Sequence, residues 1–464
     1  MVIYILLKID KMKINFIRQI LILTLLTFSY SGLNAQVWSK AFTAGGYESN
    51  NKLLGGSNSK NGWGTINQEN NSRFQDFLEF VKGKDSLVDA VLNNQDKYRL
   101  QIIYGQVTHH SKDSVSVVNS SLGNNKYYYP ASTIKLPCAL LALEKLNELN
   151  IGPNHYFRIG NDFLCGNTSH ISNSKKSKDS FYDIIKEMIV VSNNVSYNSV
   201  YEFLTPGYLK EKLREKDLND IHLYKKFAGC DILDNLKCNS ISFYDNSDRL
   251  LFKQDSSVLS LSEMAENYDY DNNKLIGSSF YKNGKNVKTP YDFNYNISAS
   301  LEGLHRSLID LIYPNTTSAS HRWNILKADR EFIIRMLGMF PRELNDIEYE
   351  DSTRYQDNLL KYIVFGDPES NSKMNKIRTF SKIGLSYGFT TEIAYVVDMV
   401  SKNECFLSVS IYTNQNKTIN DGIYEYQQIA KPFLGKLGML LLEYESKRIQ
   451  PFTPDFSSLR SLYY

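Results

Sequence analysis

The stretch that decides the fold is YYYPASTIKLPCALLALEKLNEL, residues 127–149. Its apolar residues follow one another closely after Lys135, which indicates a helix that is buried on most of its surface. Ser132 and Lys135 stand at the start of this segment, three residues apart, and side chains at that spacing share one face of a helix. The sequence therefore predicts a buried helix that carries a hydroxyl beside an amine at its N-terminal end.

A serine hydroxyl beside a lysine amine is a pair that can form an activated nucleophile. A serine hydroxyl reacts poorly until a base takes its proton, and a lysine amine can do so when burial or a second cation lowers its pKa. Free backbone N–H groups at the helix N-terminus can stabilise an oxyanion. The same spacing also occurs in polar or loop-like stretches, at Ser57, Ser172, Ser279 and Ser370. Its place before an apolar helix makes Ser132 the stronger candidate.

Composition excludes several classes of function. The 464 residues include 53 Lys and Arg against 50 Asp and Glu, and a net charge of +3 gives no field that would attract nucleic acid. The 32 Tyr and 24 Phe are scattered without a basic stripe, which favours core packing over base stacking. The seven histidines are dispersed, without an H-E-x-x-H motif, so we expect no metal site and no cofactor.

The N-terminus has the pattern of a targeting segment. Lys13 and Arg18 precede an apolar run over residues 20–28, which predicts a secretory signal peptide over residues 1–35. The run is shorter than the ~20 residues that span a bilayer, so we expect no stable membrane anchor. The mature protein is therefore expected in the periplasm or outside the cell, as a monomer. Residues 36–72 are rich in Gly, Asn and Ser and are interpreted as a loose leader.

The five cysteines are too few for a disulfide scaffold in a chain of this length. Cys230 and Cys238 could pair in an exported protein. At least one of the five must stay free.

The remaining pattern predicts an α+β fold. Strands are expected over residues 98–107 and 113–118, and again within 379–400 and 405–413. Helices are expected in between, among them one over residues 181–204. Strands at both ends of the chain imply an antiparallel sheet that the C-terminal part completes, flanked by helices and a helical subdomain.

The predicted catalytic domain covers residues 73–446, with polar insertions at about 220–288 and 341–376 and a C-terminal tail at 447–464.

Two further short motifs follow Ser132 in the chain. Ser192-Asn193-Asn194 ends the amphipathic part of the predicted helix, where a hydroxyl and a carboxamide could project into a cleft. Lys382-Ile383-Gly384 lies at the start of a predicted strand, where a glycine lets another backbone approach closely. Taken alone, the first motif is also typical of a polar helix end and the second of an edge strand.

In order, the three motifs resemble the S-x-x-K, S-D-N and K-T-G elements of class A β-lactamases and penicillin-binding proteins. The surroundings are similar too, because a strand hairpin precedes YPASTIK and Asn198 falls where the family has a second asparagine. The resemblance extends over about residues 74–446 and implies a β-lactamase/transpeptidase-like fold. It also implies a small-molecule β-lactam or a cell-wall peptide as substrate.

The resemblance implies a role for each matching residue. Ser132 would be acylated, Lys135 would accept or relay its proton, and Ser192 would pass a proton to the leaving nitrogen. Asn194 would hold the amide of the substrate and Lys382 its carboxylate. The backbone N–H groups of Ser132 and of Leu385, the residue after Gly384, would form the oxyanion hole.

Three departures from the family pattern bear on function. Asn193 replaces an aspartate that mainly supports loop structure, and Ile383 replaces a hydroxyl residue that helps to bind the carboxylate. The family's deacylating glutamate has no clear counterpart, since Glu215, Glu263 and Glu266 are only weak candidates. Three functions therefore stay open: a secreted β-lactam hydrolase, a penicillin-binding D-alanyl peptidase, and a binding protein without turnover.

Overall fold

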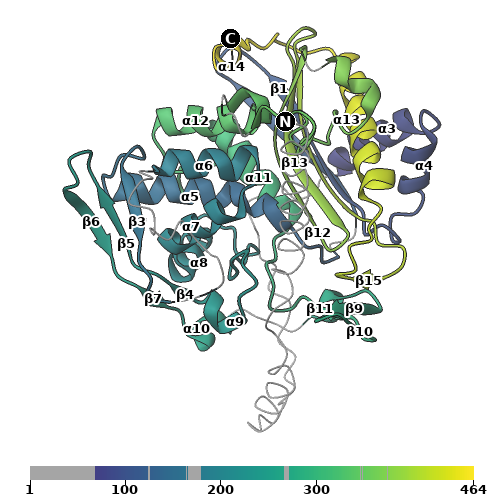
Figure 1. The fold of residues 1–464 in the computed structure, drawn as a ribbon. Helices are drawn as coiled ribbons and strands as arrows, with labels where there is room; N and C mark the ends of the chain where they lie inside the picture. The colour runs from purple at the N-terminus through teal and green to yellow at the C-terminus, as the bar shows by residue number, and fades with distance from the viewer. Residues whose placement is uncertain are drawn as a thin grey trace, which may run out of the picture.

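A five-stranded antiparallel sheet runs through the centre of the molecule (Figure 1). Its strand order is β12-β13-β14-β1-β2, so the N-terminal hairpin lies beside the C-terminal strands. The bounds are β1 Gln101–His109, β2 Val115–Leu122, β12 Ile377–Ser386, β13 Phe389–Asp398 and β14 Asn403–Tyr412. The antiparallel pairing of β1 with β14 sets Gln101 opposite Ser410. The predicted α+β architecture is confirmed.

This computed structural model describes residues 68–463 except 124–125, 164, 166–178, 266–270, 345, 347–348 and 374. The predicted signal peptide, most of the predicted leader and Glu266 lie outside the described residues. The last residues of the predicted leader are helical, because the first described helix, α3, already begins at Gln68.

The two faces of the sheet carry different sets of helices (Figure 1). One face packs against α3 Gln68–Val81, α4 Ser86–Leu92 and α13 Lys431–Ser446. The other face carries the helical subdomain, made of α5 Lys135–Glu148, α6 Phe181–Val190, α7 Asn194–Leu204, α8 Pro206–Glu215, α11 Leu301–Ile312 and α12 Lys327–Gly338. Because side chains alternate along a strand, each strand contributes to both apolar cores.

The two predicted insertions are more ordered than their composition suggests. The first contributes α9 Ile232–Asn235, α10 Leu261–Ala265, β4 Lys237–Cys238, β5 Ile241–Tyr244, β6 Leu250–Gln254, β7 Ser257–Val258, β8 Leu275–Ile276, β9 Ser279–Lys282 and β10 Lys285–Val287. These strands pair with one another and with β3 Tyr156–Ile159, β11 Tyr291–Asp292 and β15 Thr418–Ile419. The second has only short turns of helix, but its residues 362–365 are buried in the core.

The disulfide differs from the pairing considered from the sequence. Cys230 is bonded to Cys165, with the two Cα atoms 5.5 Å apart, and Cys238 is a free thiol buried against α7. Cys238 ends the short strand β4 in the apolar core, whereas Cys230 stands in the loop before α9 and meets a distant loop.

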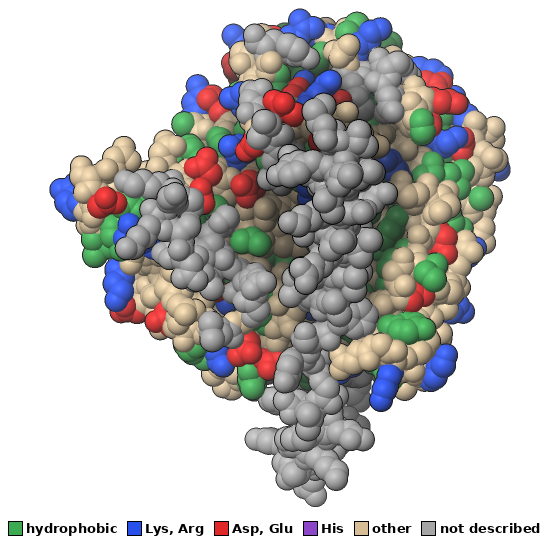
Figure 2. Space-filling model, viewed as in Figure 1, with side chains coloured by type: hydrophobic (Ala, Val, Ile, Leu, Met, Phe, Trp, Pro, Cys, Tyr) green, Lys and Arg blue, Asp and Glu red, His purple; other side chains and the backbone are tan. Residues whose placement is uncertain are grey.

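The C-terminal tail returns to the body of the protein. After α13, helix α14 Ser457–Arg460 follows, and the hydroxyl of Tyr463 donates to the carbonyl of Arg335 in α12 over 2.7 Å. Charges of both signs are interspersed on the face shown in Figure 2, outside the grey atoms. Among the described residues, no helix combines the length and apolar character that crossing a membrane requires.

Candidate active site

Ser132 stands at the N-terminal end of the helix on which the prediction rested. A short 3-10 turn, Ala131–Ile134, leads directly into α5. The hydroxyl of Thr133 donates to the carbonyl of Pro130 over 2.7 Å and closes this turn. Ala131 has a φ of 46°, a left-handed conformation that costs energy in a residue other than glycine. The strain falls immediately before the half-buried Ser132, whose neighbours on both sides are buried.

Gly384 brings the edge strand β12 against the backbone of Ser132. A Cβ atom at Gly384 would lie 2.4 Å from the carbonyl oxygen of Pro130 and 2.6 Å from the backbone nitrogen of Ser132. Such distances are shorter than any non-bonded contact allows, so only glycine fits. The predicted close approach of two backbones is therefore confirmed. Lys382, by contrast, lies in the middle of β12 and not at its start, because the strand already begins at Ile377.

Ser192 lies in a break between two helices, where the sequence predicted one continuous helix. Helix α6 ends at Val190 and α7 begins at Asn194. The φ of Ser192 is 57°, and the side chain of Asn193 caps α7 by accepting from the backbone N–H groups of Val195 and Ser196, over 2.8 and 3.1 Å. A capping residue starts a new helix because its oxygen replaces the missing backbone acceptors. The break turns Ser192 toward the lysines.

The structure brings one or more side chains of each motif together: Lys135, Ser192, Asn194 and Lys382. Lys135 Nζ donates to the carbonyl of Ser192 over 2.6 Å and to Oδ1 of Asn194 over 2.7 Å, and it lies 3.2 Å from Ser192 Oγ. Lys382 Nζ donates to Ser192 Oγ over 2.9 Å and to the carbonyl of Ile383 over 3.2 Å. The hydroxyl of Ser192 thus bridges the two amines.

Both amines are in an environment that disfavours their charged form. Burial, and secondly the charge of Lys382, hold the pKa of Lys135 well below its usual range. Burial, and secondly the charge of Lys361, lower the pKa of Lys382 to about 7. Both effects favour the neutral form of the Lys135 amine.

Aromatic rings cover Lys135. The centroids of Phe227 and Tyr197 lie 5.3 and 5.9 Å from its Nζ. Asn198 fixes Phe227 there, because its Oδ1 accepts from the backbone N–H of Phe227 over 2.8 Å and its Nδ2 donates to the Phe227 carbonyl over 3.4 Å. Asn198 is buried, so its side chain supports this loop.

The residues that depart from the family pattern have structural surroundings that explain their types. Ile383 is buried in the apolar core on the α13 side of the sheet. Asn193 acts as the helix cap described above and also donates to Glu187 over 3.3 Å, which fits a supporting role for the loop. Leu385 is half-buried and pairs with Thr390 across the β12–β13 hairpin.

The candidate deacylating bases do not join the cluster. Glu215 is exposed at the end of α8 and forms an ion pair with Lys212 over 3.0 Å. Glu263 is exposed and accepts from the backbone N–H of Ser260 over 2.8 Å. In the part of the chain that the structure describes, no carboxylate accepts a hydrogen bond from Lys135 or Lys382.

Two residues behind the cluster were missed by the sequence analysis. Lys361 and Glu392 are both buried next to β12 and β13. The signal was present, because each charge interrupts an otherwise apolar run, LLKYIVF at 359–365 and TEIAYVV at 391–397. A charge in such a run is costly to bury without a purpose or a partner.

A family model matches part of the sequence. Residues 86–266 match the model of the β-lactamase enzyme family. Over this stretch the sequence is similar to that family. The matched part contains Ser132, Lys135, Ser192 and Asn194, whereas Lys382 follows it. No curated protein matches the sequence significantly.

Similar solved structures include β-lactamases and a penicillin-binding protein. The TLA-3 extended-spectrum β-lactamase has 11% identity and a TM-score of 0.43, with 79% of this chain and 100% of that chain covered. PBP-A has 10% identity and a TM-score of 0.45, with 78% and 97% covered. A PBP-A variant solved as an acyl-enzyme complex with penicillin G has 11% identity and a TM-score of 0.44, with 81% and 97% covered.

Proposed function

We propose that this protein is a serine hydrolase that opens a β-lactam amide through an acyl intermediate on Ser132. The observation that carries the proposal is the hydroxyl of Ser192 held between the buried amines of Lys135 and Lys382, beside the start of α5. A neutral amine, a hydroxyl relay and a cation at one helix terminus provide base, acid and anion binding for acyl transfer.

Acylation would proceed as follows. Lys135 takes the proton of Ser132, and Oγ attacks the lactam carbonyl carbon. The resulting oxyanion is bound by the backbone N–H groups of Ser132 and Leu385, which Gly384 lets approach each other. As the carbon–nitrogen bond breaks, the proton on Lys135 passes through the Ser192 hydroxyl to the leaving nitrogen.

Two side chains would hold the substrate during this step. Asn194 is exposed and uses its Oδ1 on Lys135, so its Nδ2 remains for the carbonyl of the substrate's amide side chain. Lys382 in its protonated form attracts the substrate carboxylate. Its Nζ also donates a hydrogen bond to Ser192 Oγ, which keeps that hydroxyl near the bound carboxylate.

A second candidate function is a penicillin-binding peptidase that acts on cell-wall peptides. Two observations favour it. The ring of Phe227 covers Lys135, and Glu215 and Glu263 are exposed and bind other residues outside the cluster. An acyl ester without a base to activate water is long-lived. In this function the acyl group passes slowly to water or to an amine, and β-lactams act as inhibitors.

The deciding experiment follows the intact mass of the purified protein after mixing with a penicillin. An adduct that appears and decays while hydrolysed product accumulates supports the β-lactamase. A lasting adduct supports the peptidase. Absence of any adduct contradicts both functions and leaves reversible binding. Ser132→Ala is the control, since labelling that survives this substitution would exclude Ser132 as the nucleophile.

Export through the N-terminal signal, a monomeric state and the lack of a membrane anchor complete the proposal. The export proposal is supported by the apolar run at residues 20–28 behind Lys13 and Arg18.

A further inference from the structure

Phe227 lies between the amine of Lys135 and solvent. Lys135 has no exposed surface, and Tyr197, the other ring near its Nζ, is also fully buried. Phe227 is only half-buried, although its ring centroid is the nearer of the two, 5.3 Å from the Lys135 Nζ. Phe227 therefore has contact with solvent and also lies against the buried amine. A much smaller side chain at this position would uncover Lys135.

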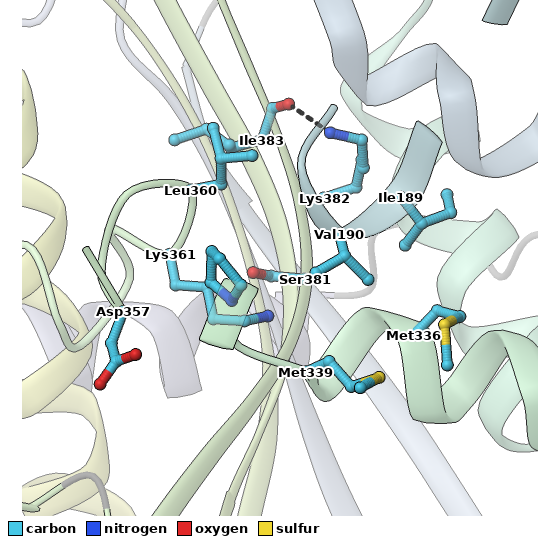
Figure 3. Close-up of a pocket in the computed structure, with 11 residues that line it drawn as sticks. Ile189, Val190, Met336, Met339, Asp357, Leu360, Lys361, Ser381, Lys382 and Ile383 are labelled. Carbon is cyan, nitrogen blue, oxygen red and sulfur yellow. Dashed lines mark hydrogen bonds between the residues drawn. The ribbon is translucent and has the colours of Figure 1, made fainter. Parts of the chain in front are cut away.

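The strand side of the site is closed by β12 and by apolar side chains. Lys382 is buried, and its Nζ donates to the carbonyl of Ile383 over 3.2 Å (Figure 3). The small pocket beside it is lined largely by apolar residues, among them Val190 at the end of α6 and Met339 after α12. Phe227 is therefore on the more accessible side of the two amines.

Helix α7 fixes the loop that carries Phe227. Asn198 and Glu202 are four residues apart in α7, so their side chains lie on the same face of the helix. Asn198 Oδ1 accepts from the backbone N–H of Phe227 over 2.8 Å. Glu202 Oε1 accepts from the Nζ of the neighbouring Lys226 over 2.7 Å. One helix face thus holds two consecutive residues of the loop.

The ion pair between Lys226 and Glu202 is a strong constraint because both side chains are buried. The second oxygen of Glu202 accepts from the backbone N–H of Asn239 over 2.7 Å. Buried charges need such partners, and removal of one partner is strongly destabilising. Three residues after Phe227, Cys230 is tied down by its disulfide. The loop is therefore held on both sides of Phe227, whose ring forms a fixed wall.

We propose that Phe227 is a specificity-determining residue that keeps water away from Lys135 once Ser132 is acylated, so that the acyl ester is long-lived. The inference rests on the proposed acylation of Ser132 and states which residue decides how long the ester lasts.

Hydrolysis of the ester needs a water molecule beside the Lys135 amine. The water gives a proton to Nζ while its oxygen bonds to the acyl carbon. The bond from that carbon to Ser132 Oγ then breaks, and Oγ takes the proton from Nζ. The ring of Phe227 occupies space beside the amine, and apolar carbon offers a water molecule there no hydrogen bond.

The test follows the loss of the adduct by intact mass after free penicillin has been removed from the acylated protein. In Phe227→Ala the adduct should be lost at least about tenfold faster than in the native protein, because water can then approach the amine that acts as its base. Phe227→Leu is the matched control, since it keeps an apolar side chain over Lys135 and should lose the adduct at nearly the native rate. An unchanged rate in Phe227→Ala, or equally fast loss in both variants, overturns the inference.

A second readout does not depend on acylation of Ser132. Acetic anhydride acetylates accessible amines, and peptide masses give the extent of reaction at each lysine. Lys135 should react several-fold faster in Phe227→Ala than in the native protein or in Phe227→Leu. The internal reference is Lys145, a half-buried lysine later in α5 whose amine contacts Gln254.

The two readouts separate this inference from the proposed function. If the native protein forms no adduct with penicillin, the proposed function fails, but the acetylation still decides whether Phe227 shields Lys135. Equal acetylation of Lys135 in the native protein and in Phe227→Ala overturns the inference. If Phe227→Ala does not fold, Phe227→Val, a smaller truncation, takes its place in both measurements.

Discussion

At the scale of single residues, Lys135 is the proposed base, because burial and the charge of Lys382 both lower the pKa of its amine. Lys135→Met should reduce the rate of Ser132 acylation by about 10²- to 10⁴-fold, the usual contribution of a general base. Labelling with a fluorescent penicillin measures this rate. Lys145→Met, on the same helix but away from Ser192, should label at the normal rate. Equal loss in both variants would indicate damage to α5 and not loss of the base.

The second prediction at the residue scale concerns Gly384. In Gly384→Ala the new Cβ would collide with the carbonyl of Pro130 and the backbone nitrogen of Ser132, so the strand and the turn must separate. Acylation should fall by about 100-fold or more, since a displaced N–H no longer reaches the oxyanion. The control is Gly152→Ala, where a Cβ would meet nothing closer than 3.6 Å. Normal acylation in Gly384→Ala would contradict the oxyanion hole proposed here.

Lys135 and Gly384 show which features of the site can be predicted from the sequence and which cannot. Residue types and spacing were enough to select Ser132, Lys135 and Gly384. They could not reveal that Ser192 Oγ bridges two amines, because that contact joins residues 190 positions apart. Lys361 was missed although its charge interrupts the apolar run at residues 359–365, because that run lies in a stretch interpreted as a polar insertion.

At the scale of elements, the break between α6 and α7 presents Ser192. Asn193→Ala removes the cap of α7 and should cost about 1 kcal/mol of stability, as cap losses usually do. Acylation should also slow, since Ser192 is no longer held between the amines. Thermal unfolding and penicillin labelling measure the two effects.

Asn193→Asp is the matched comparison for this prediction. A carboxylate at the same position accepts from the same two N–H groups and suits the positive end of the helix dipole. The variant should therefore be at least as stable as the native protein. A destabilised Asp variant would argue against the capping role.

Sequence periodicity predicted most helices and strands, but not the boundary between α6 and α7. Residues 181–204 keep an apolar stripe through the break, because α6 and α7 both face the same core. A continuous helix satisfies that pattern equally well. The left-handed backbone of Ser192 and the cap at Asn193 mark the break, and these two residues contact Lys135 and Glu187.

At the scale of the whole molecule, the buried lysines make stability depend on pH. Burial lowers the pKa of Lys361 and of Lys382 to about 7, and that of Lys145 and Lys225 to about 8. Between about pH 7 and about pH 10 the unfolded chain binds more protons than the folded one at these sites. The free energy of unfolding should therefore rise with pH over this window.

Urea unfolding at the two ends of that window measures the rise. It should be smaller in Lys382→Met, which removes one of the contributing lysines. Below about pH 7 the raised pKa of Glu392, also about 7, acts in the opposite direction, because the folded state then binds the additional proton. A fall in stability between pH 7 and pH 10 would contradict the assignment of these amines as neutral in the folded protein.

The sequence by itself determined the α+β class, the buried helix after Ser132 and the three motifs, because hydrophobic periodicity and short spacings are local properties of the chain. Only the tertiary structure decided the Cys165–Cys230 bond, the bridge at Ser192 and the charges behind Lys382. The physical reason is that pKa values and hydrogen bonds depend on burial and distance in space. Folding alone brings residues from both ends of the chain to one edge of the sheet.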